Sequence, residues 1–255
     1  MVIIHKMSLD ASFDIKNIIC SYFYDLKDTI NLYNLSKDHQ NNITITNLDD
    51  IQYKYIKGLN QLIIEQNKYK HVEKLNAHSN EKIKNVNHMK TLKKLSCGGC
   101  NCGVDQSGIS ELNLIELNAA YNYKIKNVNH MKNTLKILNC DYSSRIDQNG
   151  ILELNLIELY ATCNEKIKNV NHMKETLKKL YCAFSSGIDQ NGISELNLIE
   201  LDATGNEKIT NINHMKKTLK ILNCGWNCGI DQNGISELNL IKLNAIYNIR
   251  IKVKL

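Results

Sequence analysis

The segment LKILNCGWNCGIDQNGISEL, Leu219 to Leu238, decides the fold, because its pattern recurs along the chain. Its first half matches LKILNCDYSSRI from Leu135 and LKKLYCAFSSGI from Leu177, and the three copies start 42 residues apart. Between and after them stand LIELNAAYNYKI (114–125), LIELYATCNEKI (156–167), LIELDATGNEKI (198–209) and LIKLNAIYNIRI (240–251). Both sets obey L-x-x-L-x-[A/C]-x-x-[N/S]-x-x-I. The period is therefore 21 residues, with alanine coils and cysteine coils, named after their sixth residue, in alternation.

The array extends upstream in a less regular form. Val72 and Leu92 open two further coils of 20 and 22 residues, because one residue is lost near Lys90 and one is gained around Cys100. Nine coils then run from Val72 to the last residue. A fixed period of this length is typical of solenoids.

The template predicts one short strand in each coil. Leu222 and Cys224 point to one side of such a strand, and Ile221 and Asn223 point to the other. A strand of three residues cannot bury its apolar side alone, so we expect parallel stacking of the coils around a continuous core. The small sixth residue indicates that this core is narrow.

The rest of each coil is expected to return along the opposite side. Asn at the ninth position, as in Asn164, suits an amide that caps the backbone of its own turn. Asp231 can cap a short helix that buries Ile235 and Leu238. In alanine coils, residues such as Val170 and Met173 supply the apolar contacts.

The coils resemble leucine-rich repeats, and IDQNGISEL from Ile230 resembles the phrase that ends repeats of the cysteine-containing subclass. The resemblance covers residues 72–255 and implies an α/β solenoid, a horseshoe with a parallel concave β-sheet and short convex helices, preceded by a small helical segment. It also implies that binding takes place on the concave sheet.

Two columns of possible metal ligands are too widely spaced to share an ion. Parallel strands lie about 4.8 Å apart, so side chains two coils apart are separated by roughly 10 Å. A disulfide needs Cα atoms within about 7 Å, and a zinc ion needs each sulfur at about 2.3 Å. We therefore interpret the cysteines as small core residues, and the histidines as residues of the convex surface or turn caps. The columns are Cys97, Cys140, Cys182 and Cys224, and His88, His130, His172 and His214.

Two further motifs invite a metal. The Asp-Gln-Asn-Gly run, as at Asp189, has Gly fourth rather than sixth and an apolar residue fifth, which disfavours a calcium loop and favours a helix cap. Cys97, Cys100 and Cys102 form one C-x-x-C-x-C without a partner motif, so a soft metal there would need an outside ligand. No nucleophile triad, phosphate loop or carboxylate pair stands out. The sequence predicts a protein without cofactor or metal that is not an enzyme.

The outward positions of each coil, the third, fifth, seventh and eighth, offer a binding surface. The eighth position is aromatic in five of nine coils, although aromatic residues make up only 6% of the chain. Tyrosine and tryptophan anchor protein interfaces, whereas a purely structural alternative is that these rings pack on one another. The candidate target-binding residues are Tyr121, Tyr142, Tyr160, Tyr181, Phe184, Trp226 and Tyr247.

The first part of the chain departs from the repeat. FDIKNIICSYF from Phe13 and DTINLYNLSK from Asp28 predict two amphipathic helices. Together they resemble an F-box, although Ala11-Ser12 replaces the usual Leu-Pro and His39 an aromatic residue. The resemblance implies docking on a Skp1-like adaptor of a cullin-RING ubiquitin ligase, while the repeats hold an unknown target protein. The docking residues would be Ile15, Ile19, Phe23, Ile30 and Leu35.

Three units follow: 1–42, F-box-like; 43–71, an irregular capping coil; and 72–255, the repeats. LNQLIIEQN from Leu59 fits the repeat template but starts only 13 residues before Val72, so we expect an irregular entry coil that covers the first strand edge. A repeat protein with only a helical N-terminal cap, and no role with ubiquitin, is the alternative. The near-identical repeats, rich in Asn, Ile and Lys and lacking proline, also resemble those of giant amoebal DNA viruses, which implies the host's ligase and cytoplasm.

Composition limits the other function classes. The net charge of +6 comes without a basic cluster, so a nucleic-acid partner is not expected, although a binder of anionic surfaces through the many lysines is a third hypothesis. No stretch approaches the roughly 18 apolar residues of a membrane span, and no signal peptide is seen. Nine cysteines without such a signal indicate free thiols in a reducing compartment, by default the cytosol.

Overall fold

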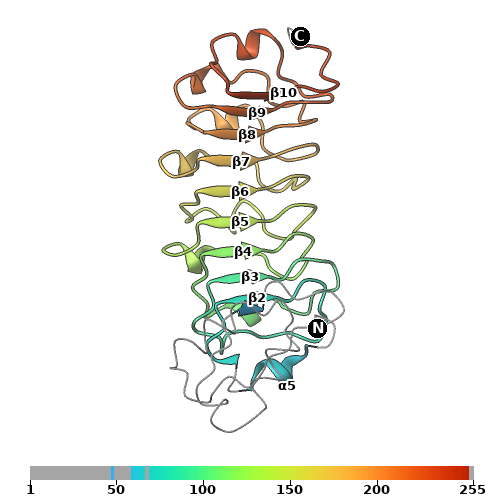
Figure 1. Ribbon diagram of the computed structural model, residues 1–255, viewed down its shortest axis with the longest axis vertical. Helices are drawn as coiled ribbons and strands as arrows, with labels where there is room; N and C mark the ends of the chain where they lie inside the picture. The colour runs from blue at the N-terminus through green and yellow to red at the C-terminus, as the bar shows by residue number, and fades with distance from the viewer. Residues whose placement is uncertain (1–46, 49–58, 67–68, 253–255) are drawn as a thin grey trace, which may run out of the picture.

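The computed structural model describes residues 47–48, 59–66 and 69–252. These residues form a stack of coils along one axis (Figure 1). The F-box-like segment, with Ile15, Ile19, Phe23, Ile30 and Leu35, lies outside the described residues, as does the expected boundary between residues 42 and 43.

One parallel sheet runs the length of the stack, in sequence order. Its strands are β1 (Asn47–Leu48), β2 (Lys74–Asn76), β3 (Lys94–Ser96), β4 (Glu116–Asn118), β5 (Ile137–Asn139), β6 (Glu158–Tyr160), β7 (Lys179–Tyr181), β8 (Glu200–Asp202), β9 (Ile221–Asn223) and β10 (Lys242–Asn244). The fourth residue of each template pairs with the fourth of the next, as Leu201 does with Leu222. The leucine-rich repeat solenoid expected from the sequence is confirmed, including the 20- and 22-residue coils that separate β2, β3 and β4.

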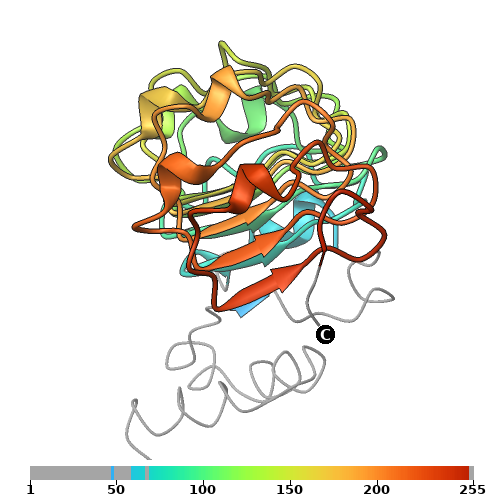
Figure 2. The same cartoon turned by 90° about the horizontal axis from the view of Figure 1, so that it is seen from above.

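Single turns of 3-10 helix lie on the side opposite the sheet, which we call the helical side (Figure 2). They are η2 (Ser107–Ile109), η3 (Asn129–Met131), η4 (Asn171–Met173), η5 (Asn191–Ile193), η6 (Asn213–Met215) and η7 (Asn233–Ile235). Nine or ten residues separate each of these strands from the start of its helical turn. A coil of 21 residues therefore has room for one tight turn, and the 3-10 form, at three residues per turn, fits that length.

The core is a stack of similar layers, one in each coil, between the sheet and the helical side. The fourth-position leucine of strands β2–β9 is buried between two half-buried neighbours. The sixth-position residues alternate without exception from Ala77 through Cys97 to Ala245, and all are buried. Small side chains at this point let the coils stack at strand spacing, so burial is contiguous from β1 to β10.

The segment before the first regular coil is folded differently from our expectation. Gln61–Ile64 forms a short helix, α5, on the Asn60 cap. The edge of β2 is covered instead by β1, with Leu48 beside Leu75. The sequence misled because L-x-x-L also describes the buried side of a helical turn.

Residues 59–66 take the place of the helical turn of a cysteine coil. The carbonyl of Leu59 accepts from Asn80, as that of Val104 does from Asn122. Gln61 bonds the backbone of Asn85 as Gln106 bonds that of Asn127. Among the described residues, no helix has the length and apolar content needed to cross a bilayer.

Candidate functional site

The eighth position of every regular coil has a left-handed backbone. Its φ is 58° at Tyr121, 55° at Phe184 and 58° at Trp226, and two of the nine coils carry glycine there, Gly99 and Gly205. A residue with a side chain costs about 1–2 kcal/mol in this conformation. Glycine is therefore the residue that the backbone favours, and the aromatic residues oppose that preference.

These aromatic residues are also exposed. We call Tyr121, Tyr142, Phe184, Trp226 and Tyr247 the aromatic column. Between 40% and 72% of each residue's surface is accessible to solvent. The outward orientation expected for the eighth position is thus confirmed, whereas the seventh is more covered than expected, with Asp141 and Ala183 buried.

Part of the column is held together by ring contacts between neighbouring coils. The rings of Tyr121 and Tyr142 stack with centroids 4.6 Å apart and an interplanar angle of 4°. Trp226 and Tyr247 meet at 5.2 Å and 57°. Such pairs are worth about 0.5–1.5 kcal/mol beyond area burial, which is comparable to the backbone cost. Both expectations for these rings, exposure and mutual packing, therefore apply to one column.

A second pair of aromatic residues lies on the sheet itself. Tyr160 of β6 and Tyr181 of β7 stack at 4.3 Å and 3°. The Tyr160 hydroxyl donates to Glu158, and the Tyr181 hydroxyl donates to Glu200 at 3.0 Å. Burial and the carboxylate of Glu158 raise the pKa of Tyr160 to about 12, and burial with Glu200 raises that of Tyr181 further. Both tyrosines therefore remain neutral hydrogen-bond donors.

Charge is unevenly distributed over the outward positions of the sheet. On β6–β8, Glu158, Glu200 and Asp202 face a single cation, Lys179, which lies 3.6 Å from Glu158. On β2–β4, Lys94 and Glu116 pair at 2.5 Å and Lys74 adds one positive charge. The middle of the sheet is therefore acidic, although the whole chain is basic.

The aromatic column is interrupted at two small residues, Cys163 and Gly205. Phe184 leans over Gly205, where an added Cβ would lie 2.8 Å from the ring. A shallow hollow of about 560 Å³ opens there and is lined by Glu165, Phe184, Ser185, Gly205, Glu207 and Lys208.

A buried carboxyl group lies beside the column. Asp141 accepts from the backbone N–H of Thr162 at 2.6 Å, and only 8% of the residue is exposed. Burial raises its pKa to about 6, against the hydrogen bond from Thr162, which lowers it. Sequence reasoning missed this group, because the seventh position of the other coils is small or neutral.

The cysteine column lies in the core, as expected. Cys97, Cys140, Cys182 and Cys224 are buried and free. Burial raises the pKa of each thiol, to about 12 for Cys224. These thiols are therefore neutral and poorly nucleophilic.

The three cysteines of C-x-x-C-x-C do not converge. Cys97 and Cys102 are buried, whereas Cys100 is exposed. Cys102 also occupies the same core place as Cys228, each before a glycine whose Cβ would strike the preceding coil. In the parts of the chain that the structure describes, no three Cys, His, Asp or Glu side chains could hold a metal ion.

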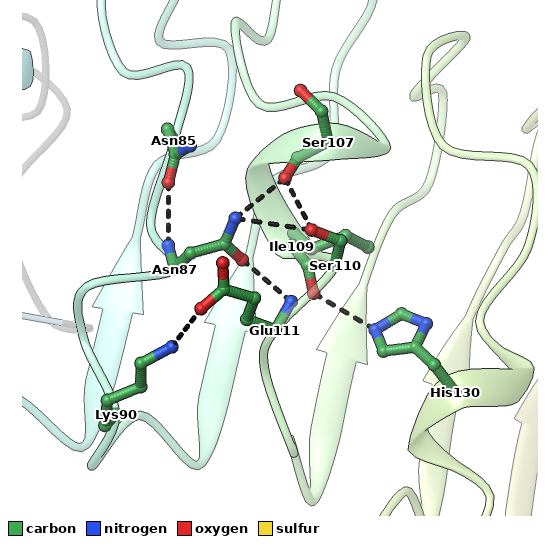
Figure 3. A network of polar contacts seen from close by, with 8 residues as sticks. All are labelled: Asn85, Asn87, Lys90, Ser107, Ile109, Ser110, Glu111 and His130. Carbon is green, nitrogen blue, oxygen red and sulfur yellow. Dashed lines mark hydrogen bonds and ion pairs between the residues drawn. The ribbon is translucent and has the colours of Figure 1, made fainter.

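The histidine column joins coils on the helical side. Nε2 of His130 lies 3.0 Å from the carbonyl oxygen of Ile109 in the preceding coil, and His88, His172 and His214 repeat this contact. Figure 3 shows the surrounding network, in which Asn87 bonds the backbone of Ser107 and Glu111 and Lys90 pairs with Glu111. The histidines are thus structural joints, a role close to the expected one but directed at the neighbouring coil.

The ninth-position asparagines form a second, buried set of joints. Asn164 accepts from Lys166 N, as expected for a cap of its own turn. It also donates to the carbonyls of Cys140 and Ile146 in the preceding coil. Asp231, one residue before the N-cap Gln232, accepts from Gly234 N of η7 at 2.8 Å and so satisfies an N–H at the start of that turn. These motifs serve the fold, which leaves the aromatic column and the acidic middle of the sheet as the candidate site.

No family model matches the chain, and no curated protein does so either. Solved structures similar to it include the following two. One is the functional domain of InlJ from Listeria monocytogenes, which includes a cysteine ladder, with 20% identity over 83% of this chain and a TM-score of 0.44. The other is a chain of the yeast Rad7–Elc1 complex, with 13% identity over 78% of this chain, 85% of that one and a TM-score of 0.29. The chain spans 48% of the InlJ domain. At these scores the likeness carries no argument about function.

Proposed function

We propose that the chain is a non-enzymatic interaction scaffold whose aromatic column and sheet bind a target protein. The observation that supports it is the exposed aromatic side chains in left-handed backbone. Stability would favour glycine there, as at Gly99 and Gly205, and burial does not explain rings that are 40–72% exposed. Exposed aromatic residues are the usual anchors of protein interfaces.

The helical side lacks such an anchor set in the described residues. Exposed charged groups on this side form ion pairs between coils, as Lys132 does with Glu153 and Lys174 with Glu195. Pairs this exposed contribute at most about 1 kcal/mol each, and their partners are already satisfied. The sheet and column are therefore the better surface for a target.

Affinity purification of the tagged chain from its native cell tests this function. Phe184→Ala combined with Trp226→Ala should abolish co-purification of the specific partner. Lys132→Ala combined with Lys174→Ala, on the helical side, should retain it. Equal recovery of the partner by both double variants would contradict target binding through the column.

We further propose that residues 1–42 dock on a Skp1-like adaptor, which makes the chain a substrate-recognition subunit of a ubiquitin ligase. This part rests on the F-box resemblance of the sequence alone. The viral resemblance of the repeats adds that adaptor and ligase belong to a host cell and that the chain acts in its cytoplasm.

A pull-down with a Skp1-like protein tests the adaptor role. The wild-type chain should bind it and Ile19→Asp should not. If the wild-type chain binds no such adaptor while its target still co-purifies, the alternative of a repeat-only interaction protein replaces this one.

A further inference from the structure

The coil that carries β8 has shorter side chains than the preceding coil at the fifth and eighth positions, and a shorter one than the following coil at the eighth. At the fifth and eighth positions it has Asp202 and Gly205. The preceding coil has Tyr181 and Phe184 at these positions, and the following coil has Asn223 and Trp226. Tyr181, Asp202 and Asn223 are in register across three strands. We call this depression, with Asp202 and Gly205 as its floor, the β8 trough, and the hollow of about 560 Å³ shares Gly205 and Phe184 with it.

The Tyr181 ring presents one face to the trough. Its other face is covered by Tyr160, parallel to it and 4.3 Å away. Stacked rings on adjacent strands follow the direction of the stack, so the second face of Tyr181 looks toward β8. There the register partner is Asp202, whose short side chain leaves space above it.

Two carboxylates surround that space. Glu200 is held by the Tyr181 hydroxyl at 3.0 Å. Asp202 accepts from Thr204 N at 2.9 Å and from Asn223 Nδ2 at 3.4 Å. Each carboxylate can accept about four hydrogen bonds, so both keep free acceptor sites while their positions are fixed.

The nearby cations are engaged elsewhere. Lys179 lies by Glu158 at 3.6 Å, and Lys208 donates to the Ser186 carbonyl at 2.9 Å. Glu165 and Glu207 line the hollow together with Phe184, and Lys208 is the one cation in that lining. The trough thus combines ring faces with carboxylates twice, at Tyr181 and at Phe184.

We propose that the β8 trough binds a basic segment of the partner protein, with an arginine guanidinium stacked on Tyr181 and paired with Glu200 and Asp202. A guanidinium is planar, stacks on aromatic faces and pairs with carboxylates in two parallel hydrogen bonds. A second basic side chain fits the hollow beside Phe184. The proposal deepens the target-binding function above, because the trough lies within the same surface.

The binding of short peptides to the full chain tests the trough directly. The probe is a glycine-rich peptide with two arginines, and the control peptide carries citrulline, which has nearly the same shape without charge. Trp226, the chain's only tryptophan, borders the trough, so its fluorescence reports binding. The arginine peptide should bind the chain, and its affinity should fall as the salt concentration rises. That affinity should exceed the affinity of the citrulline peptide by tenfold or more.

Variants locate the site. Asp202→Asn and Glu200→Gln should each lower the affinity for the arginine peptide by about tenfold, which is the usual scale for one charge-assisted hydrogen-bonded pair. Asn stands at the fifth position of the coils that carry β2, β4, β5, β9 and β10, so Asp202→Asn suits the fold. Glu116→Gln is the matched control, since it makes the same change on the same face at β4 and should have no effect.

Equal binding of the two peptides, or equal loss in Glu200→Gln and Glu116→Gln, would overturn the proposal. Binding of an anionic probe such as a short oligonucleotide at the trough would overturn it as well. If the column variants still abolish capture of the native partner in that case, the target-binding function stands and only the basic segment is refuted.

Discussion

Tyr121 and Tyr123 form a matched pair of residues for testing the cost of the left-handed backbone at the eighth position. They are of one residue type, two residues apart, and 42% and 46% exposed. Tyr121 has a φ of 58°, whereas Tyr123 is not among the residues with positive φ. Replacing each by alanine and by glycine removes the ring in both cases, so the lost stacking of Tyr121 on Tyr142 cancels within its pair.

The expected signs are opposite at the two positions. At Tyr121 glycine relieves about 1–2 kcal/mol of left-handed strain but gives the unfolded chain about 0.4–1 kcal/mol more entropy. The glycine variant should therefore be more stable than the alanine variant by about 0.5–1 kcal/mol. At Tyr123 only the entropy acts, and the glycine variant should be less stable by about 0.4–1 kcal/mol.

Urea unfolding of the four variants, followed by circular dichroism, measures this difference. In thermal unfolding, each 1 kcal/mol corresponds to about 2–4 °C in Tm for a chain of this size. If alanine is at least as stable as glycine at Tyr121, the column carries no backbone strain. The argument that its rings are kept for binding then fails.

Three further predictions concern the core and its thiols. Asn164→Ala should cost about 3 kcal/mol or more in urea unfolding, because two carbonyls and one N–H lose their buried partner; a loss under 1 kcal/mol would show that water replaces the amide. The pKa of Asp141 is raised in the folded state, so its folded form holds the proton longer and stability should fall as pH rises from about 4 to about 6. Asp141→Asn should remove that slope and stabilise the protein above pH 6 in denaturation at several pH values, and an unchanged slope would contradict the assignment. Among the described cysteines, Cys100 should react with iodoacetamide in the native protein well before Cys140, as seen by peptide mass spectrometry, since Cys100 is exposed and burial raises the pKa of Cys140; equal rates would indicate an open core.

The sequence was sufficient for the strands, because each coil repeats one template and the period fixes the register. Leu201 and Leu222 had to face the same core once 21 residues separated them. The alternation of alanine and cysteine at the sixth position was equally readable. Repetition thus supplied the evidence for fold that an isolated strand of three residues does not give.

The left-handed eighth position was missed, although a signal was present. Gly99 and Gly205 share that position with Tyr121 and Trp226, and glycine at a repeated place marks a backbone that needs positive φ. The contacts between coils were missed for another reason. His130 and Asn164 bond backbone carbonyls of the preceding coil. Every residue has such a carbonyl, so the sequence does not show which one is the partner.

The β8 trough is partly readable from the sequence and partly dependent on contacts that the sequence does not show. Its floor is visible in the sequence as the short Asp202 and Gly205, once the register with Tyr181 and Phe184 is known. The hydrogen bond that holds Glu200 and the hollow beside Phe184 depend on side-chain conformations. Periodicity fixes which residues are neighbours, but not how their side chains turn.

The joints between coils also determine how an array of this kind can change its length. Lys–Glu pairs join each alanine coil to the next cysteine coil, as between Lys132 and Glu153. Glutamine joins each cysteine coil to the next alanine coil, as between Gln148 and Asn169. Loss of one coil would bring two coils of the same kind together with mismatched joints, whereas loss or duplication of two would leave every junction as it was. Repeat number should therefore change in pairs of coils, and each added pair would extend the proposed target-binding surface without a new interface having to evolve.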